Sequence, residues 1–342
     1  MSIIREYNRR DFLVTTGGAL AGFAAAQAFG AEVVSKQYGL VVGHHEGGKA
    51  GMAVLAGGGN AVDAIVCAAL VAGVVAVPMC GIGGYGGHMA IGIASPSPDR
   101  GGERVGCIDF NSEAPAAARP DMFPLDDKGN VKGKVNEHGW LAAGVPGTLA
   151  GLQLALDRFG SRSFAQLVDP AIRYARDGFR MNWSPGVSAT ALSRDAGSRK
   201  LFWHNGKPLE RGATYRNPDL AAMLEKLAEQ GSVSDFYRGD IARQIAAAFK
   251  KNGGLVTAED MAAYKPIESP PLTLDWNDHT IATAPLTAGG LTILQAIAEL
   301  KSLGTDWDRL AKDSPKRTQM WIEALRIAWG DRLRLFGDPR FV

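Results

Sequence analysis

Apolar residues recur at helical spacing along most of the chain, and short alternating runs separate these stretches. The spacing predicts helices within residues 46–56, 60–77, 145–160, 163–178, 217–231, 239–254, 257–264, 289–304 and 314–338. Alternating or continuous apolar runs predict strands at 38–42, 88–93 and 104–110, and a hairpin that turns at Asn277 and Asp278. Residues 182–218 are polar and show no regular apolar pattern, which predicts an irregular segment that covers part of the protein surface. Helices and strands mix without a clear linker or repeat, which favours one mixed α/β domain.

The stretch around Asn60 predicts a boundary between two helices. Gly57 to Gly59 end the first helix, because glycine adopts the left-handed C-terminal conformation without a Cβ penalty. Asn60 is a good N-cap for the second helix, and Asp63 places a carboxylate in its first turn, where negative charge suits the dipole. This second helix is apolar almost all round, which predicts deep burial. We therefore interpret Asp63 as a helix-start residue rather than a catalyst.

The segment CGIGGYGG, which begins at Cys80, contains the spacing G-x-G-x-x-G at Gly81, Gly83 and Gly86. A dinucleotide site needs a strand before these glycines and a helix after them, because the helix N-terminus binds the pyrophosphate. Here the predicted order is reversed. The sequence therefore disfavours a cofactor-dependent oxidoreductase, and we expect no cofactor. The glycines instead predict a close approach of two backbones where a strand enters a sheet.

Composition excludes several function classes. The chain has 342 residues, 46% of them hydrophobic, which is enough to bury a large core. A formal net charge of +2 without a Lys/Arg-rich block gives no electrostatic footprint for nucleic acid. Cys67, Cys80 and Cys107 are an odd number without metal-type spacing. We predict structural thiols, with neither a disulfide framework nor a metal site.

Residues 1–30 predict an export signal that is not part of the fold. Arg9 and Arg10 precede a weakly apolar run that ends in small residues near Gly30, an arrangement typical of a twin-arginine signal. The run is too rich in glycine to span a membrane well, and no other segment approaches the ~20 apolar residues that a spanning helix needs. We predict a periplasmic or secreted protein, residues 31–342, without stable membrane association after export.

Three histidines raise the question of a hydrolytic triad. The sequence has no G-x-S-x-G elbow, and nothing in it ties a histidine to a serine. We predict structural roles for His44 and His45, at a strand-to-helix junction. His88 follows the glycine run, and a place in a pocket wall stays open for it.

Two patterns on the last predicted helix have structural interpretations. Glu323, Asp331 and Arg332 predict an ion-paired face. Trp321 and Trp329, eight residues apart, predict one buried face of this helix.

Eight stretches together resemble the large subunit of γ-glutamyltransferase-family enzymes, in the family's order. They are GGNAVDA (58–64), GIGGYGG (81–87), EAPAAARPDMF (113–123), VPGTLAGL (145–152), LVDPAIRYARDGF (167–179), FYRGDIARQI (236–245), GGLVTAEDMAAY (253–264) and EALRIAWGDRLRLFGDPRFV (323–342). The resemblance covers the chain from about residue 38 to its end. One such stretch is weak evidence, whereas eight in the same order are strong.

The resemblance implies an N-terminal-nucleophile hydrolase, a four-layer αββα sandwich made as a precursor that cuts itself into two subunits. In that family the nucleophile is a threonine at the new N-terminus of the small subunit, and its own amine serves as general base. We expect this chain to end before the cleavage point. No catalytic residue is then expected within it, and the small subunit of the same precursor is its expected partner.

One departure from the family pattern lies in the expected substrate pocket. The family carries an arginine that grips the α-carboxylate of the γ-glutamyl group, in the context D-[FY]-R-E-x-A-P. This sequence has DFNSEAP, with Asn111 at the arginine position, followed by Ser112 and Glu113. Loss of a charge-assisted contact to a carboxylate removes about 1.5–3 kcal/mol, and Glu113 beside the substrate would repel a carboxylate. The family's P-P-S-S-G-G is also altered, to PLTAGG at 285–290.

We assign substrate binding to Asn111, Ser112 and Glu113 and expect a small-molecule amide as substrate. Two kinds of acyl group compete. One is γ-glutamyl, and the other is a different small acyl group, as in oxamate amidohydrolase-like or cephalosporin acylase-like branches. Asn111 favours the second. A catalytically incomplete relative that acts as a binding protein is the non-enzymatic alternative.

Overall fold

The computed structural model describes residues 39–77, 79–94, 105–183, 189–304, 307 and 309–341. The predicted export signal, residues 1–30, therefore lies outside the described residues. Within them, no helix is long and apolar enough to cross a membrane.

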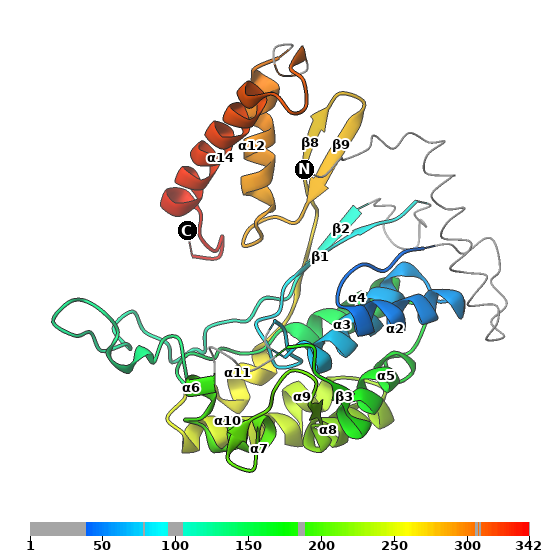
Figure 1. Ribbon diagram of the computed structural model, residues 1–342, viewed down its shortest axis with the longest axis vertical. Coiled ribbons are helices and arrows are strands. Elements are labelled where there is room, and N and C mark those ends of the chain that lie inside the picture. The colour runs from blue at the N-terminus through cyan, green and yellow to red at the C-terminus, as the bar shows by residue number, and fades with distance from the viewer. Residues whose placement is uncertain are drawn as a thin grey trace.

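The chain forms a large helical body and a smaller outer lobe, joined through a central sheet (Figure 1). The body contains α2 (His45–Ala56), α3 (Ala61–Val75), α4 (Thr148–Phe159), α5 (Phe164–Asp177), α6 (Ala189–Leu192), α7 (Ala196–Phe202), α8 (Pro218–Gln230), α9 (Ser234–Arg238), α10 (Asp240–Lys251) and α11 (Ala258–Ala263). The outer lobe contains β8 (Leu272–Trp276), β9 (His279–Thr283), α12 (Gly290–Ser302) and α14 (Pro315–Leu335). The nine predicted helices and the hairpin at Asn277 are confirmed, with shifts of a few residues at their ends.

The central sheet consists of β1 (His88–Gly92), β2 (Val105–Asp109) and β7 (Ile267–Ser269), all antiparallel, with β2 in the middle. Ala90 pairs with Cys107, and Cys107 pairs on its other side with Ser269. The strands β1 and β2 were predicted. β7 was not, because three residues between Pro266 and Pro270 are too few to show an alternating pattern.

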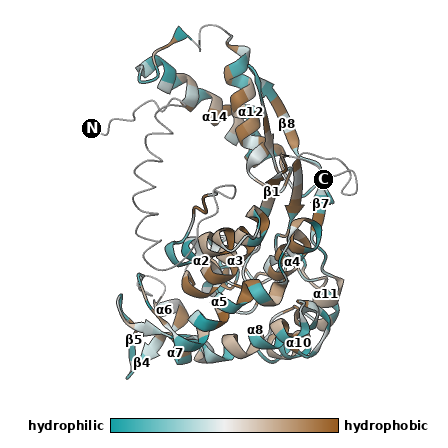
Figure 2. Ribbon diagram, turned by 90° about the vertical axis from the view of Figure 1, so that its right-hand side faces the viewer, coloured by the Kyte–Doolittle hydropathy of each residue, from teal (hydrophilic) through white to brown (hydrophobic). Residues whose placement is uncertain are grey.

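Helix α3 lies at the centre of the body, as its apolar sequence predicted. Leu70 and Val71 are fully buried, and α2, α4 and α5 pack around the helix. Figure 2 shows α3 as a largely hydrophobic helix enclosed by these neighbours. The core thus gathers around a helix whose side chains are apolar on almost every side.

Asn60 and Asp63 begin α3 as a capping box. The Asn60 side chain accepts hydrogen bonds from the backbone N–H groups of Val62 and Asp63, and Asp63 accepts one from the Asn60 N–H at 2.8 Å. The Asp63 carboxylate is completely buried and also accepts hydrogen bonds from the Ser161 N–H (2.8 Å), the Ser161 hydroxyl (2.5 Å) and the Arg162 N–H (3.1 Å). Burial opposes ionisation, but these hydrogen bonds outweigh it and hold the pKa of Asp63 below its ordinary value. The structural interpretation of Asp63 is confirmed, and the residue also ties α3 to the turn before α5.

The glycine-rich loop leads into β1, with no helix after it. Gly86 has a φ of +93°, and a Cβ placed there would lie 1.9 Å from the carbonyl oxygen of Phe110. The next residue, Gly87, accepts a hydrogen bond from the Phe110 N–H at 2.8 Å. The prediction of a close backbone approach is therefore confirmed, and this contact brings the loop beside the residues that follow β2.

The outer lobe has its own small core, formed by Ala296, Leu300, Trp307, Ala324 and Ala328. Trp321 packs against this core, with its ring centroid 5.6 Å from that of Trp307. Trp329 is 52% exposed, so the prediction of a shared buried face is wrong. Eight residues advance a helix by about 80° beyond two full turns, which carries Trp329 away from the face that α12 covers.

The ion-paired face of α14 is confirmed only in part. Glu323 pairs with Arg326 at 2.7 Å and Asp331 with Arg334 at 3.0 Å. Arg332 instead donates hydrogen bonds to the Ala288 carbonyl and the Thr292 hydroxyl, which fasten α14 to the start of α12.

Two further expectations are wrong. Residues 39–42 form no strand, and Leu40 and Val42 are about four-fifths exposed. The stretch 182–218 is no mere covering, because its described part contains α6, α7 and three two-residue strands: β4 (Trp203–His204), β5 (Lys207–Pro208) and β6 (Thr214–Tyr215). β6 pairs with β3 (Phe179–Arg180). A separate small core forms there around Phe202 and Tyr215, which are too far apart in the sequence to show a periodic pattern.

Candidate functional site

The predicted substrate residues Asn111, Ser112 and Glu113 follow β2 directly, and backbone hydrogen bonds hold each of them. The Asn111 N–H donates to Asp109 Oδ1 at 2.9 Å, and the Ser112 N–H donates to the Tyr85 carbonyl at 2.5 Å. Glu113 forms a two-way bridge with Val145. The glycine-rich loop and the segment before α4 therefore fix this turn from both sides.

The Asn111 side chain connects the body to the outer lobe. Its Nδ2 donates a hydrogen bond to Thr287 Oγ1 at 2.7 Å and lies 3.3 Å from His88 Nε2. The same His88 nitrogen lies 3.3 Å from Asp109 Oδ2. His88, for which the sequence left a pocket role open, is thus part of the polar cluster around Asn111.

Glu113 reaches the C-terminal segment. Its carboxylate pairs with Arg340, which also forms hydrogen bonds with Asp338 at 2.7 to 3.2 Å. The hydrogen bonds that Arg340 donates to Asp338 and to Glu113 raise the pKa of Arg340, and Arg340 in turn holds the pKa of Asp338 below its ordinary value. The guanidinium of Arg340 therefore lies between two carboxylate side chains, and Asp338 stays ionised near neutral pH.

A small cavity of about 140 Å³ joins these groups. Besides the three predicted residues, its wall includes Tyr85, Asp109, Tyr264, Lys265, Thr287, Asp338 and Arg340. Tyr264 donates its hydroxyl proton to the Asn111 carbonyl at 2.7 Å and stacks on Tyr237, and burial raises its pKa. The cavity is thus lined mainly by polar groups, and Tyr264 ties its wall to the backbone of Asn111.

Sequence reasoning missed several of these residues. Thr287 lies in the stretch 285–290. Its departure from the family pattern indicated a change in the pocket but did not show which residue lines it. Arg340 lies in the family-like C-terminal stretch and had no sequence signal as a pocket residue, because its partner Glu113 is 227 positions away. No pattern in the sequence predicted Tyr264 or Lys265 as pocket residues either.

The other histidines stay outside this cluster. His44 Nδ1 lies 3.0 Å from a carboxylate oxygen of Glu46, at the start of α2. Among the described residues, no serine hydroxyl forms a hydrogen bond with a histidine, and no three His, Cys, Asp or Glu side chains are grouped to hold a metal ion. The three cysteines, all within the described residues, are free thiols.

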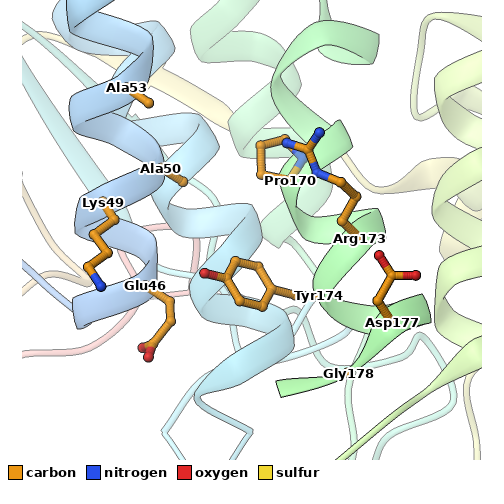
Figure 3. A pocket seen from close by; sticks show the side chains of 9 residues that line it. All are labelled: Glu46, Lys49, Ala50, Ala53, Pro170, Arg173, Tyr174, Asp177 and Gly178. Carbon is orange, nitrogen blue, oxygen red and sulfur yellow. The ribbon is translucent and has the colours of Figure 1, made fainter. Parts of the chain in front are cut away.

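A second hollow of about 410 Å³ lies between α2 and α5. Figure 3 shows Glu46 and Lys49 extending from α2, and Arg173, Tyr174 and Asp177 extending from α5. Two carboxylates (Glu46 and Asp177) and two cations (Lys49 and Arg173) line it, so its formal charges balance. It contains none of the predicted substrate residues, so the cavity at Asn111 is the better candidate.

Comparison with known proteins supplies the family. The family described as Gamma-glutamyltranspeptidase matches residues 47–342. The chain is 39% identical over 298 residues to the glutathione hydrolase proenzyme of Escherichia coli (strain K12), covering 85% of this chain and 49% of that protein. It is 33% identical over 309 residues to the capsule biosynthesis protein CapD proenzyme of Bacillus anthracis, covering 89% and 52%. The chain therefore spans about half the length of these relatives.

A solved structure agrees with these matches. The crystal structure of Helicobacter pylori gamma-glutamyltranspeptidase superposes with a TM-score of 0.80 at 32% identity, covering 91% of this chain and 88% of that chain. This likeness confirms the predicted α/β fold class. The chain belongs to the γ-glutamyltranspeptidase family.

Proposed function

We propose that residues 31–342 are the large-subunit part of a self-processing enzyme that hydrolyses or transfers the acyl group of a γ-glutamyl-type amide. The observation that carries this proposal is the match to proenzymes over almost the whole described chain, at up to 39% identity. The relatives' names favour glutamyl chemistry over the oxamate amidohydrolase-like and cephalosporin acylase-like alternatives. They also favour an enzyme over a binding protein.

The chemistry follows from the proposed partner. The hydroxyl of an N-terminal threonine, on the small subunit of the same precursor, attacks the amide carbonyl, and its free amine takes the proton. The leaving amine departs with a proton, and the resulting ester passes its acyl group to water or to a second amine. In this scheme Asn111, Ser112 and Glu113 hold the distal end of the acyl group, and no residue of this chain acts as nucleophile.

Two surfaces support a protein partner of this kind. On α14, Ile322, Trp329 and Leu333 are 58%, 52% and 83% exposed. Among the described strands, β1 pairs only with β2, so its other edge has unpaired backbone groups. Apolar side chains and an open sheet edge are both costly in water, and a second subunit would cover them.

Export is the finer part of the proposal. Arg9 and Arg10 with the following apolar run support transport through the twin-arginine route to the periplasm or beyond. N-terminal sequencing of the mature protein from a cell fraction tests this. Cytoplasmic protein with an intact residue 1–30 segment would contradict it.

The central test uses the full precursor. Intact-mass measurement should give two fragments, the smaller beginning with threonine, and the processed protein should release p-nitroaniline from an acyl anilide. Replacement of that threonine by alanine should leave one uncut, inactive chain. A precursor that stays whole and turns over no anilide would favour the binding-protein alternative and refute the proposal.

A further inference from the structure

The cavity at Asn111 carries an excess of negative charge. Its wall contains the carboxylates of Asp109, Glu113 and Asp338 against the cations of Lys265 and Arg340. Arg340 is engaged by two of these carboxylates at once. Lys265 is exposed to solvent, where its attraction for an anion is screened. A free carboxylate entering this cavity therefore meets little uncompensated positive charge from the described residues.

The orientation of Asn111 adds a second constraint. Its Nδ2 group already donates to Thr287 and contacts His88. No described residue donates a hydrogen bond to its Oδ1. With the donor end of the amide occupied by the protein, Asn111 offers an acceptor to whatever enters the cavity.

Ser112 completes the set of available groups. Its backbone N–H donates to the Tyr85 carbonyl, while its hydroxyl has no hydrogen-bond partner among the described residues. A hydroxyl donates as well as accepts. Both residues line the cavity. An acceptor from Asn111 together with a donor from Ser112 matches a carboxamide, which carries one NH₂ and one C=O. It does not match a carboxylate, which has acceptors only.

We propose that this pocket selects an acyl group whose α-carbon carries a neutral amide in place of a free carboxylate, and that Thr287 sets this preference by holding the Asn111 side chain. The inference rests on the proposed function, because it places the acyl group in this cavity. Thr287 is a positioning residue in this account, since it acts through Asn111.

A matched pair of substrates tests the inference. γ-Glutamyl-p-nitroanilide and its α-carboxamide counterpart differ only in the group that would face Asn111. We expect the processed full-length enzyme to show a kcat/KM at least tenfold higher for the carboxamide. Asn111→Arg should reverse that ratio in favour of the carboxylate, and Thr287→Val should reduce it at least threefold, chiefly through KM. Thr214→Val, on the exposed side of β6 in the body, is the control and should leave the ratio unchanged.

The outcomes separate the two proposals. Failure of self-cleavage, or no turnover of either anilide, refutes the proposed function and this inference with it. Processing with efficient turnover of the γ-glutamyl anilide, at a kcat/KM equal to or above that of the carboxamide, overturns this inference alone. An unchanged ratio in a folded and processed Thr287→Val enzyme would remove the positioning role.

Discussion

Asp63→Asn is the sharpest test of how the core is held together. The wild-type carboxylate accepts four hydrogen bonds: two on Oδ1, from the Ser161 and Arg162 N–H groups, and two on Oδ2, from the Asn60 N–H and the Ser161 hydroxyl. Asparagine keeps one oxygen and places an NH₂ group at the other position. The Ser161 hydroxyl can turn to accept from that NH₂, but the Asn60 N–H then faces a donor.

The magnitude follows from these contacts. Hydrogen bonds to a charged acceptor contribute about 1.5–3 kcal/mol each, and an unsatisfied buried donor costs about 1–3 kcal/mol. With one bond lost outright and the others weakened by loss of charge, Asp63→Asn should lower the free energy of unfolding by about 3–5 kcal/mol. This is a large share of the 5–15 kcal/mol typical of a folded protein.

Urea unfolding of the full precursor, followed by tryptophan fluorescence, measures the effect. Trp183 is a suitable reporter, because its indole N–H donates to the Val75 carbonyl at the end of α3, at 2.8 Å. Asp126→Asn is the matched control, since Asp126 accepts hydrogen bonds from the N–H groups of Lys128 and Asn130 in an exposed turn. A shift for Asp63→Asn below about 1 kcal/mol, or no larger than that of the control, would refute the reasoning.

The same contacts predict a pH dependence. The folded-state pKa of Asp63 is lowered from the ordinary value of 3.8. A lowered carboxyl pKa contributes stability above the unfolded value, and this stability is lost as pH falls through the folded value. The difference in stability between wild type and Asp63→Asn should therefore be constant near neutral pH and shrink below about pH 4.

Two further predictions concern the glycine loop and the thiols. Gly86→Ala should lower the free energy of unfolding by at least about 2–3 kcal/mol in thermal or urea unfolding, because the left-handed φ alone costs about 1–2 kcal/mol and the new Cβ would overlap the Phe110 carbonyl. Gly87→Ala is the control and should cost clearly less, because its Cβ would meet only an aromatic ring at 3.5 Å. Equal effects of the two substitutions would contradict the close backbone approach at Gly86. In peptide mapping after alkylation, Cys80, which is exposed, should be modified in the native protein, while the buried Cys67 and Cys107 should react only after unfolding. The rate at Cys80 should rise with pH, because the thiolate is the reactive form and the raised pKa of Cys80 keeps it mostly protonated near neutral pH. Native labelling of either buried thiol would show that the core opens more readily than its packing indicates.

Local signals in the sequence were enough for most of the elements. Asn60 begins its helix as its side-chain chemistry predicted, with the expected hydrogen bonds to the following N–H groups. Thr257 and Asn217 cap two other helices in the same way. β7 escaped prediction because its place depends on pairing with β2, 158 or more positions away, rather than on its own sequence. Trp329 was misplaced because two large apolar residues suggested burial without regard to the angle between them.

The candidate site was predictable only where one segment carried the whole signal. Asn111, Ser112 and Glu113 were adjacent in a recognisable stretch, and the structure places them together in one cavity. Thr287 and Arg340 come from segments about 175 and 230 positions further along the chain, and only the folded arrangement brings them to the same wall. Hydrogen bonds across such separations leave no periodic pattern, so no local reading of the chain could pair them.

The wall of this cavity is shared by two parts of the molecule that have separate cores. Thr287 precedes α12 and Arg340 follows α14, and neither is among the described residues that form the core around α3. Substitutions at these positions can change the shape of the cavity without lowering the stability of the helical body. A library of variants at residues 286–288 and 339–341 should accordingly include enzymes that prefer other acyl groups, with little loss in the yield of folded protein. These two segments are therefore the natural starting point for redesigning substrate selectivity.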